Sequence, residues 1–130
     1  MIALPNGAEF LLYREPADMR KSFDGLSGIV REKFGREPTD GTLFLFINRR
    51  RDRIKLLYWD RDGLALWYKR LESGSLERID RAGGAAIRLD ATELSMLLSG
   101  VSLSRIKRRK RFAAGAKKIP TKSQEGACAF

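Results

Sequence analysis

The sequence has 130 residues, which suits a single domain, with one cysteine, no histidine and a formal net charge of +10. One cysteine cannot form an internal disulfide, and the lack of histidine removes the commonest general base and metal ligand. No apolar run approaches the ~18 residues of a membrane span, and the first residues do not resemble a signal peptide, so we expect a cytoplasmic protein.

The positive charge is concentrated toward the C-terminal end. Residues 101–130 contain nine Lys or Arg and one Glu, a net charge of +8, whereas residues 1–100 contain 17 basic and 15 acidic residues. Such a basic segment favours a polyanionic partner, with nucleic acid first and an acidic protein surface or a membrane second. The alternative interpretation is a solubilising end without a partner.

The first part of the chain predicts one strand and one helix. Residues 9–13 (EFLLY) are interpreted as an edge strand. From Met19 to Phe34 the apolar residues recur in steps of three and four, which predicts an amphipathic helix over residues 18–34 that ends at Gly35. Phe23 lies on the apolar face of this helix, so we expect it in the core. Residues 36–41 contain turn residues.

The middle of the chain predicts a β-hairpin, because residues 42–47 and 54–59 are short apolar runs joined by a polar segment. The first run is apolar on both faces, which indicates a central strand with Phe44 in the core. Five basic residues lie at or near the hairpin tip: Arg49, Arg50, Arg51, Arg53 and Lys55. They are interpreted as an anion-binding tip, and the alternative is an ordinary solvated turn.

The remaining elements are shorter. Residues 64–71 fit both helical spacing and the period of a strand, and we favour a short helix. Residues 76–79 and 86–89 are strand candidates. Asp90, with Glu93 three residues later, predicts the start of a helix over residues 91–99.

After residue 104 the apolar pattern ends, so we expect a domain over residues 1–104 and a basic, disordered tail over residues 105–130. The predicted fold class is α+β. It consists of a small antiparallel β-sheet built on the central hairpin and packed by two to three helices, with the basic tail following.

Several blocks of the sequence resemble, in order, those of one bacterial family: DMRKSFDGL at 18–26, LFLF at 43–46, NRRRDRIKLLYWD at 48–60, residues 63–71, and LSMLLSG at 94–100. The family is the accessory protein of IS-sixty-six-type insertion sequences, the second open reading frame, often called TnpB. The resemblance covers about residues 1–104. It implies a role in transposition beside a separate, larger transposase encoded by the same element. Two residues depart from the pattern, because Arg51 and Ser22 stand where the family usually carries Gly.

Contact with DNA is the first functional hypothesis. Arginine's planar fork suits phosphate, and a two-stranded ribbon can enter a major groove. The expected DNA-contacting residues are Arg49, Arg50, Arg51, Arg53, Lys55, Arg105, Lys107, Arg108, Arg109, Lys110 and Arg111. Aromatic residues at 58, 59, 67 and 68 are interpreted as core residues rather than base-stacking platforms. The second hypothesis is a protein adaptor that docks on the transposase without reading DNA.

An enzyme is the third hypothesis and the least favoured. Metal-dependent phosphoryl chemistry needs converging carboxylates, and the candidates are Asp18, Asp24, Asp52, Asp60 and Asp62. Asp60 and Asp62 flank a single turn residue, and Asp52 lacks the spacing to Lys55 of the acid-x-Lys nuclease motif. We therefore expect a non-enzymatic protein without catalytic residues, metal, cofactor, small-molecule substrate or membrane partner.

Overall fold

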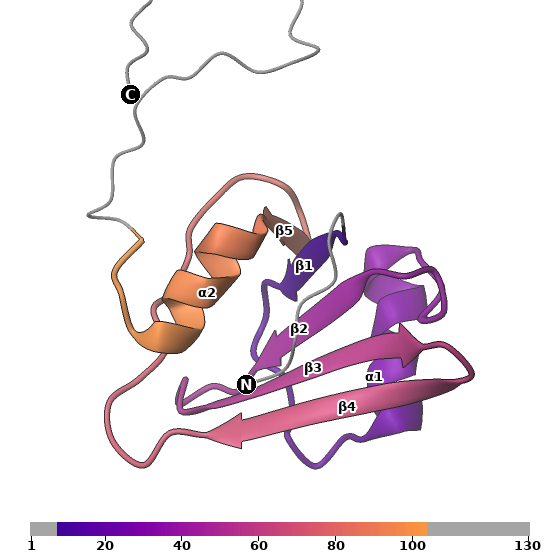
Figure 1. Ribbon diagram of the computed structural model, residues 1–130, viewed down its shortest axis with the longest axis horizontal. Helices are drawn as coiled ribbons and strands as arrows, with labels where there is room; N and C mark the ends of the chain where they lie inside the picture. The colour runs from indigo at the N-terminus through magenta and orange to yellow at the C-terminus, as the bar shows by residue number, and fades with distance from the viewer. Residues whose placement is uncertain (1–7, 104–130) are drawn as a thin grey trace, which may run out of the picture.

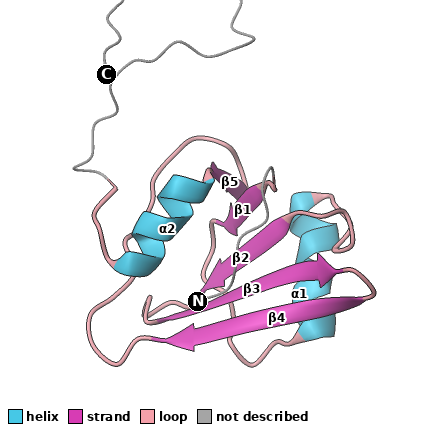
Figure 2. Cartoon of the chain, in the orientation of Figure 1, coloured by secondary structure: helices cyan, strands magenta, loops and turns pink. Residues whose placement is uncertain are grey.

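The computed structural model describes residues 8–103, which form one five-stranded sheet with helices on both faces (Figures 1 and 2). The elements in chain order are β1 (Phe10–Tyr13), α1 (Phe23–Ile29), the π-helix η1 (Val30–Phe34), β2 (Leu43–Ile47), β3 (Arg53–Asp60), β4 (Gly63–Arg70), β5 (Ala86–Leu89) and α2 (Ala91–Ser99). The strand order is β4-β3-β2-β1-β5. The α+β class is thus confirmed, while the predicted tail over residues 105–130 lies outside the described residues.

The central strand β2 separates two cores, as its two-sided apolar pattern predicts. Successive side chains of a strand point to opposite faces of the sheet. Every residue of β2 is buried, because a core covers each of these faces. Leu45 belongs to the core that α2 covers with Leu94, and Phe44 belongs to the core that α1 covers with Leu26. Phe34 of η1 contacts the ring of Phe44 edge-on, with the centroids 5.3 Å apart.

The sheet is mixed rather than antiparallel, which corrects the prediction for one strand pair. β1 and β2 are parallel, with Leu11 opposite Phe44, because the chain crosses over through α1 and η1 between them. β1 is also not an edge strand. It lies between β2 and the antiparallel β5, where Leu11 is opposite Arg88. The edges of the described sheet are therefore β4 and β5.

Residues 63–70 form strand β4, so the helix favoured over residues 64–71 is wrong. β4 pairs antiparallel with β3 along its whole length, with Leu66 opposite Leu57 and Trp67 opposite Leu56. Leu66 packs against the α1 core and Trp67 against the α2 core. Because the local spacing fits both structures, pairing with β3 decides the outcome.

The first helix starts at Phe23, five residues after the predicted Asp18. Phe23 is 42% exposed, so its expected place in the core is wrong.

Residues 76–79 do not form a strand, although Leu76 is buried in the α2 core. Across residues 8–103 no helix has the length and apolar character that crossing a bilayer requires.

The second helix and the strand before it are confirmed. β5 spans Ala86–Leu89 and α2 spans Ala91–Ser99. The carboxylate of Asp90 accepts a hydrogen bond from the Glu93 N–H at 2.7 Å, and a carboxylate oxygen of Glu93 accepts one from the Asp90 N–H at 3.0 Å. This capping box begins the helix, and Gly100, with a φ of +84°, ends it.

Candidate nucleic-acid interface

Asn48 orders the turn between β2 and β3. Its side-chain carbonyl accepts hydrogen bonds from the N–H groups of Asp52 and Arg53 at 3.1 and 3.0 Å, and its amide donates to the Asp52 carboxylate at 2.7 Å. Asn is favoured in turns because its short side chain bonds nearby backbone in this way. Arg49 and Arg50 therefore occupy an ordered turn and point outward as exposed residues. In the described part of the chain, neither side chain forms a hydrogen bond or an ion pair.

Arg51 turns back toward the domain instead of facing solvent. Its φ is +61°, in the left-handed region that glycine adopts without steric cost, which accounts physically for the glycine usual at this position in the resembled family. Its guanidinium donates to the Leu76 carbonyl at 3.0 Å and to the Glu77 carbonyl at 2.7 Å. Burial is the main cause that lowers the pKa of Arg51, and the charge of Arg78 lowers it further.

Lys55 is a buried structural residue, with 5% of its surface exposed. Its ammonium donates to the carbonyls of Met19 and Lys21 at 2.8 and 2.7 Å and lies 4.6 Å from the centre of the Tyr68 ring. An ammonium has three donors, and these partners leave little for an external anion. The lysine instead binds the loop that precedes α1, which begins at Phe23.

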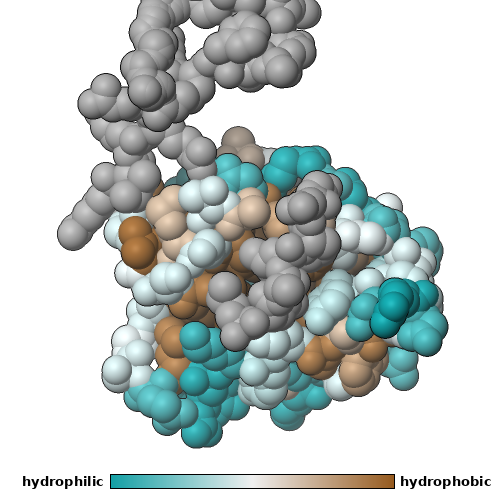
Figure 3. Space-filling model, viewed as in Figure 1, coloured by the Kyte–Doolittle hydropathy of each residue, from teal (hydrophilic) through white to brown (hydrophobic). Residues whose placement is uncertain are grey.

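Arg53 keeps a place at the surface near the tip and gains a basic neighbour. It lies directly opposite Arg70 in the pairing of β3 and β4, and one guanidinium nitrogen lies 3.3 Å from the Tyr68 hydroxyl. Arg70 is exposed and pairs with Glu72 at 3.0 Å. Like charges directly opposite in a sheet repel, and a bound anion would reduce that repulsion. Hydrophilic residues gather over this end of β4 at the lower left of Figure 3.

Sequence reasoning missed Arg70, because residues 64–71 were interpreted as a helix. The period-two alternation of the same residues is the signal for a strand, and the pairing of that strand with β3 sets Arg70 opposite Arg53. The predicted residues Arg105, Lys107, Arg108, Arg109, Lys110 and Arg111 lie outside the described residues.

Two of the candidate carboxylates, Asp52 and Asp18, form hydrogen bonds with neighbouring residues of the domain. Asp52 belongs to the turn, where the hydrogen bond from Asn48 is the main cause that lowers its pKa. Asp18 pairs with Arg20 at 2.8 Å, and the hydrogen bonds from Arg20 lower its pKa to about 2. Among residues 8–103, no group of three acidic or cysteine side chains is placed to hold a metal ion.

The aromatic residues at positions 58, 59, 67 and 68 divide between the two faces of the sheet. Tyr58 and Trp67 pack against the α2 core, as their expected core role requires. Trp59 and Tyr68 are 37% and 48% exposed. The exposed pair therefore differs from the expectation, and both residues remain accessible to a partner.

The comparisons with known proteins agree with the resemblance in the sequence. A family model described as "IS66 Orf2 like protein" matches residues 8–108. The chain is 32% identical over 109 residues to the uncharacterised protein y4jC of Sinorhizobium fredii (strain NBRC 101917 / NGR234), which covers 84% of the chain and 92% of that protein. It is 38% identical over 84 residues to y4hO of the same strain, which covers 65% of the chain and 72% of that protein. No solved structure matches the chain.

Proposed function

The chain belongs to the IS66 Orf2-like family, and from this premise we propose that it acts in transposition as a non-enzymatic accessory factor that contacts DNA through the end of the sheet at the hairpin tip. The family supports an accessory role associated with an insertion sequence. The contact with DNA is inferred from the charges and geometry at the tip.

The observation that carries the proposal is the group of arginines around this end, of which Arg49, Arg50 and Arg70 are exposed and Arg53 is half-buried. Arg49 and Arg50 face solvent on an ordered turn, while Arg53 and Arg70 are adjacent on the paired strands. Guanidinium groups bind phosphate oxygens through several donors, and such contacts supply much of the affinity for DNA. Lys55 is left out of this contacting set, because its ammonium binds main-chain carbonyls. Arg51 does not belong to the outward-facing group, because its guanidinium turns back toward the domain.

The position of residue 103 supports joint action of the tip and the basic segment that follows. The Leu103 N–H donates to the Glu77 carboxylate at 2.6 Å, and the Glu77 carbonyl accepts from Arg51 at 2.7 Å. The chain therefore enters its basic segment from a point linked to the hairpin tip. Arg105 and Lys107–Arg111, the predicted contacts of that segment, follow Leu103 in the sequence.

The direct test compares DNA binding by the wild-type chain with that of Arg49→Ala/Arg50→Ala. The duplexes carry either the terminal repeats of the element or a scrambled sequence. Contacts to the DNA backbone predict weaker binding by the variant to both duplexes, whereas base readout predicts a loss confined to one sequence. Unchanged binding to both duplexes would contradict a role of the tip in DNA contact.

A protein adaptor that docks on the transposase is the second candidate. Its support is the exposure of three large hydrophobic residues, Phe23, Trp59 and Tyr68, together with the position of β4 at the edge of the described sheet. Aromatic residues are enriched in protein interfaces, and an edge strand can pair with a strand from a partner. Capture of the purified transposase in the presence of nuclease tests this candidate. Capture that disappears with the DNA would argue against an adaptor.

A further inference from the structure

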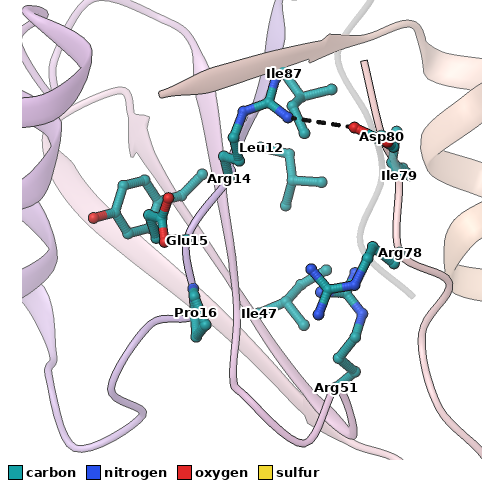
Figure 4. A pocket seen from close by; sticks show the side chains of 11 residues that line it. Leu12, Arg14, Glu15, Pro16, Ile47, Arg51, Arg78, Ile79, Asp80 and Ile87 are labelled. Atoms are coloured by element: carbon teal, nitrogen blue, oxygen red, sulfur yellow. Dashed lines mark ion pairs between the residues drawn. The ribbon is translucent and has the colours of Figure 1, made fainter. Parts of the chain in front are cut away.

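A pocket of about 220 Å³ lies at the carboxyl ends of the parallel strands β1 and β2, next to the hairpin tip (Figure 4). Part of its wall is apolar and includes Leu12, Ile47, Ile79 and Ile87. The volume is below the roughly 300–1,000 Å³ of pockets that enclose a small organic ligand, and well above the ~30 Å³ occupied by one water molecule. The pocket therefore suits a small ion or one functional group of a larger ligand.

Three arginines reach this pocket from three segments. Arg14 follows β1, Arg51 belongs to the hairpin tip, and Arg78 lies between β4 and β5. Arg14 donates to the Gly84 carbonyl, and Arg51 donates to the Leu76 carbonyl. These bonds fix the direction of two guanidinium groups. Because each guanidinium has five N–H donors, both retain donors for a ligand.

The guanidinium groups of Arg51 and Arg78 lie together at one end of the pocket (Figure 4). The charge of Arg78 lowers the pKa of Arg51 in addition to the larger effect of burial, which agrees with their proximity. Of the ion pairs within residues 8–103, none includes Arg78. Two adjacent positive charges at a partly apolar wall repel each other, and a bound anion would relieve that repulsion.

Two carboxylates also line the pocket, and both lie away from the arginine pair in Figure 4. Asp80 is 4.0 Å from Arg14, and its side chain is 98% exposed. Glu15 is exposed on the other side, beside Pro16. Neither carboxylate therefore occupies the space between Arg51 and Arg78.

We propose that this pocket binds a single phosphate group, held by the guanidinium groups of Arg51 and Arg78. Planar guanidinium forks match the oxygens of a phosphate, and such charge-assisted hydrogen bonds are stronger beside an apolar wall than in water. Phosphate is the anion expected here because the pocket adjoins the exposed arginines of the tip. The identity of the ligand therefore rests on the proposed contact with DNA. In DNA, the bound phosphate lies either in the interior of a DNA strand or at its 5′ end.

Inorganic phosphate, added to the full chain, tests the pocket without DNA. Phosphate should raise the Tm of the wild-type protein above that in chloride of equal ionic strength, because a ligand that binds the folded state stabilises it. Arg78→Ala should bind phosphate roughly tenfold or more weakly, since it loses hydrogen bonds to a charged group. The control Arg61→Asn removes one exposed positive charge at the opposite end of β3 and should keep the shift. No phosphate-specific shift in the wild type, or the full shift in Arg78→Ala, would overturn the proposal.

Duplexes with 5′-phosphate or 5′-hydroxyl ends distinguish the two sources of the phosphate. A terminal phosphate predicts that the wild type prefers the phosphorylated duplex and that Arg78→Ala loses this preference. An internal phosphate predicts that Arg78→Ala weakens binding to both duplexes equally. If Arg78→Ala binds both duplexes as tightly as the wild type does, the pocket is not a DNA-phosphate site.

The tip variant Arg49→Ala/Arg50→Ala separates failure of the pocket from failure of the proposed function. If that variant weakens DNA binding while Arg78→Ala changes neither phosphate nor DNA binding, the pocket proposal fails and the proposed DNA contact stands. If Arg78→Ala alone loses the inorganic phosphate shift and the tip variant binds DNA normally, the pocket stands as a phosphate site and the tip contact fails.

Discussion

Arg51 and Leu76 exchange hydrogen bonds although they lie 25 positions apart in the sequence. The Leu76 N–H donates to the Arg51 carbonyl at 2.7 Å, and the Arg51 guanidinium donates to the Leu76 carbonyl at 3.0 Å. These bonds attach the hairpin tip to the segment between β4 and β5. The same segment brings Arg78 to the pocket, so Arg51 links the turn, the core residue Leu76 and the proposed phosphate site.

The left-handed backbone at Arg51 predicts different effects for two substitutions. Both Arg51→Gly and Arg51→Ala remove the side-chain bonds to Leu76 and Glu77, but alanine also retains the steric cost of a φ of +61°. We therefore expect Arg51→Gly to be more stable than Arg51→Ala by about 1–2 kcal/mol in urea unfolding. Equal unfolding midpoints for the two variants would contradict the left-handed conformation at this position.

The difference in burial between Phe44 and Phe23 predicts a large loss of stability for one substitution and a small loss for the other. Phe44 is fully buried between the sheet and α1, so Phe44→Ala should lower the free energy of unfolding by about 3–5 kcal/mol. Phe23→Ala serves as the matched control because Phe23 is 42% exposed, and it should cost much less. Thermal melts of both variants measure the difference. A larger loss of stability in Phe23→Ala than in Phe44→Ala would be inconsistent with this packing.

Glu9 predicts a dependence of stability on pH. Its carboxylate accepts hydrogen bonds from Arg36 at 2.8 and 3.2 Å and also pairs with Arg88, and the Arg36 bond is the main cause that holds the pKa of Glu9 below its ordinary value of 4.5. Because the unfolded state then binds the proton more readily, the stabilisation is present above about pH 4.5 and is lost as the pH falls through the lowered pKa.

Glu9→Gln should therefore have a lower Tm than the wild type near pH 7, and the two melting curves should converge in acid. The control Glu32→Gln alters an exposed carboxylate on η1 and should follow the wild type at both pH values. If the difference in Tm between wild type and Glu9→Gln stays constant from neutral to strongly acidic pH, the ionised Glu9 carboxylate is not the cause of the pH dependence.

Removal of residues 105–130 tests the predicted domain boundary. The truncated chain keeps Ser102 and Leu103, which bind the Glu77 carboxylate at 3.2 and 2.6 Å, so its Tm should remain close to that of the full chain. Its DNA binding should weaken, because the removed residues contain nine Lys or Arg. A truncated chain that does not fold would place the boundary beyond residue 104.

Local signals were sufficient for several elements of the fold. Asp90, Glu93 and Gly100 define α2 from its own sequence, and the continuous apolar run of β2 indicates a strand buried on both faces. The loop before Phe23 binds Lys55 through the Lys21 carbonyl, 34 positions away, and the local spacing of apolar residues does not reveal that contact. The parallel pairing of β1 with β2 likewise depends on how the crossover returns to the sheet.

The candidate site was predictable in composition but not in the direction of its side chains. Arg49 and Arg50 are exposed, as a basic tip requires, because the bonds of Asn48 shape the turn locally. Arg51 turns inward because its partners lie in a segment distant in sequence, which the pattern of charges at the tip does not reveal. Arg78 was missed for the same reason, since only the folded chain brings it to the hairpin tip.

The salt dependence of DNA binding tests the central claim most directly. Each phosphate contact contributes about 0.9 to the slope of log K against log salt on duplex DNA, so Arg49→Ala/Arg50→Ala should flatten the slope by about 2 relative to the wild type. The control Lys33→Ala/Arg61→Asn removes the same number of exposed positive charges away from the tip and should leave the slope unchanged. If the tip variant has the wild-type slope, or if the control flattens it equally, the hairpin tip is not the surface that contacts DNA.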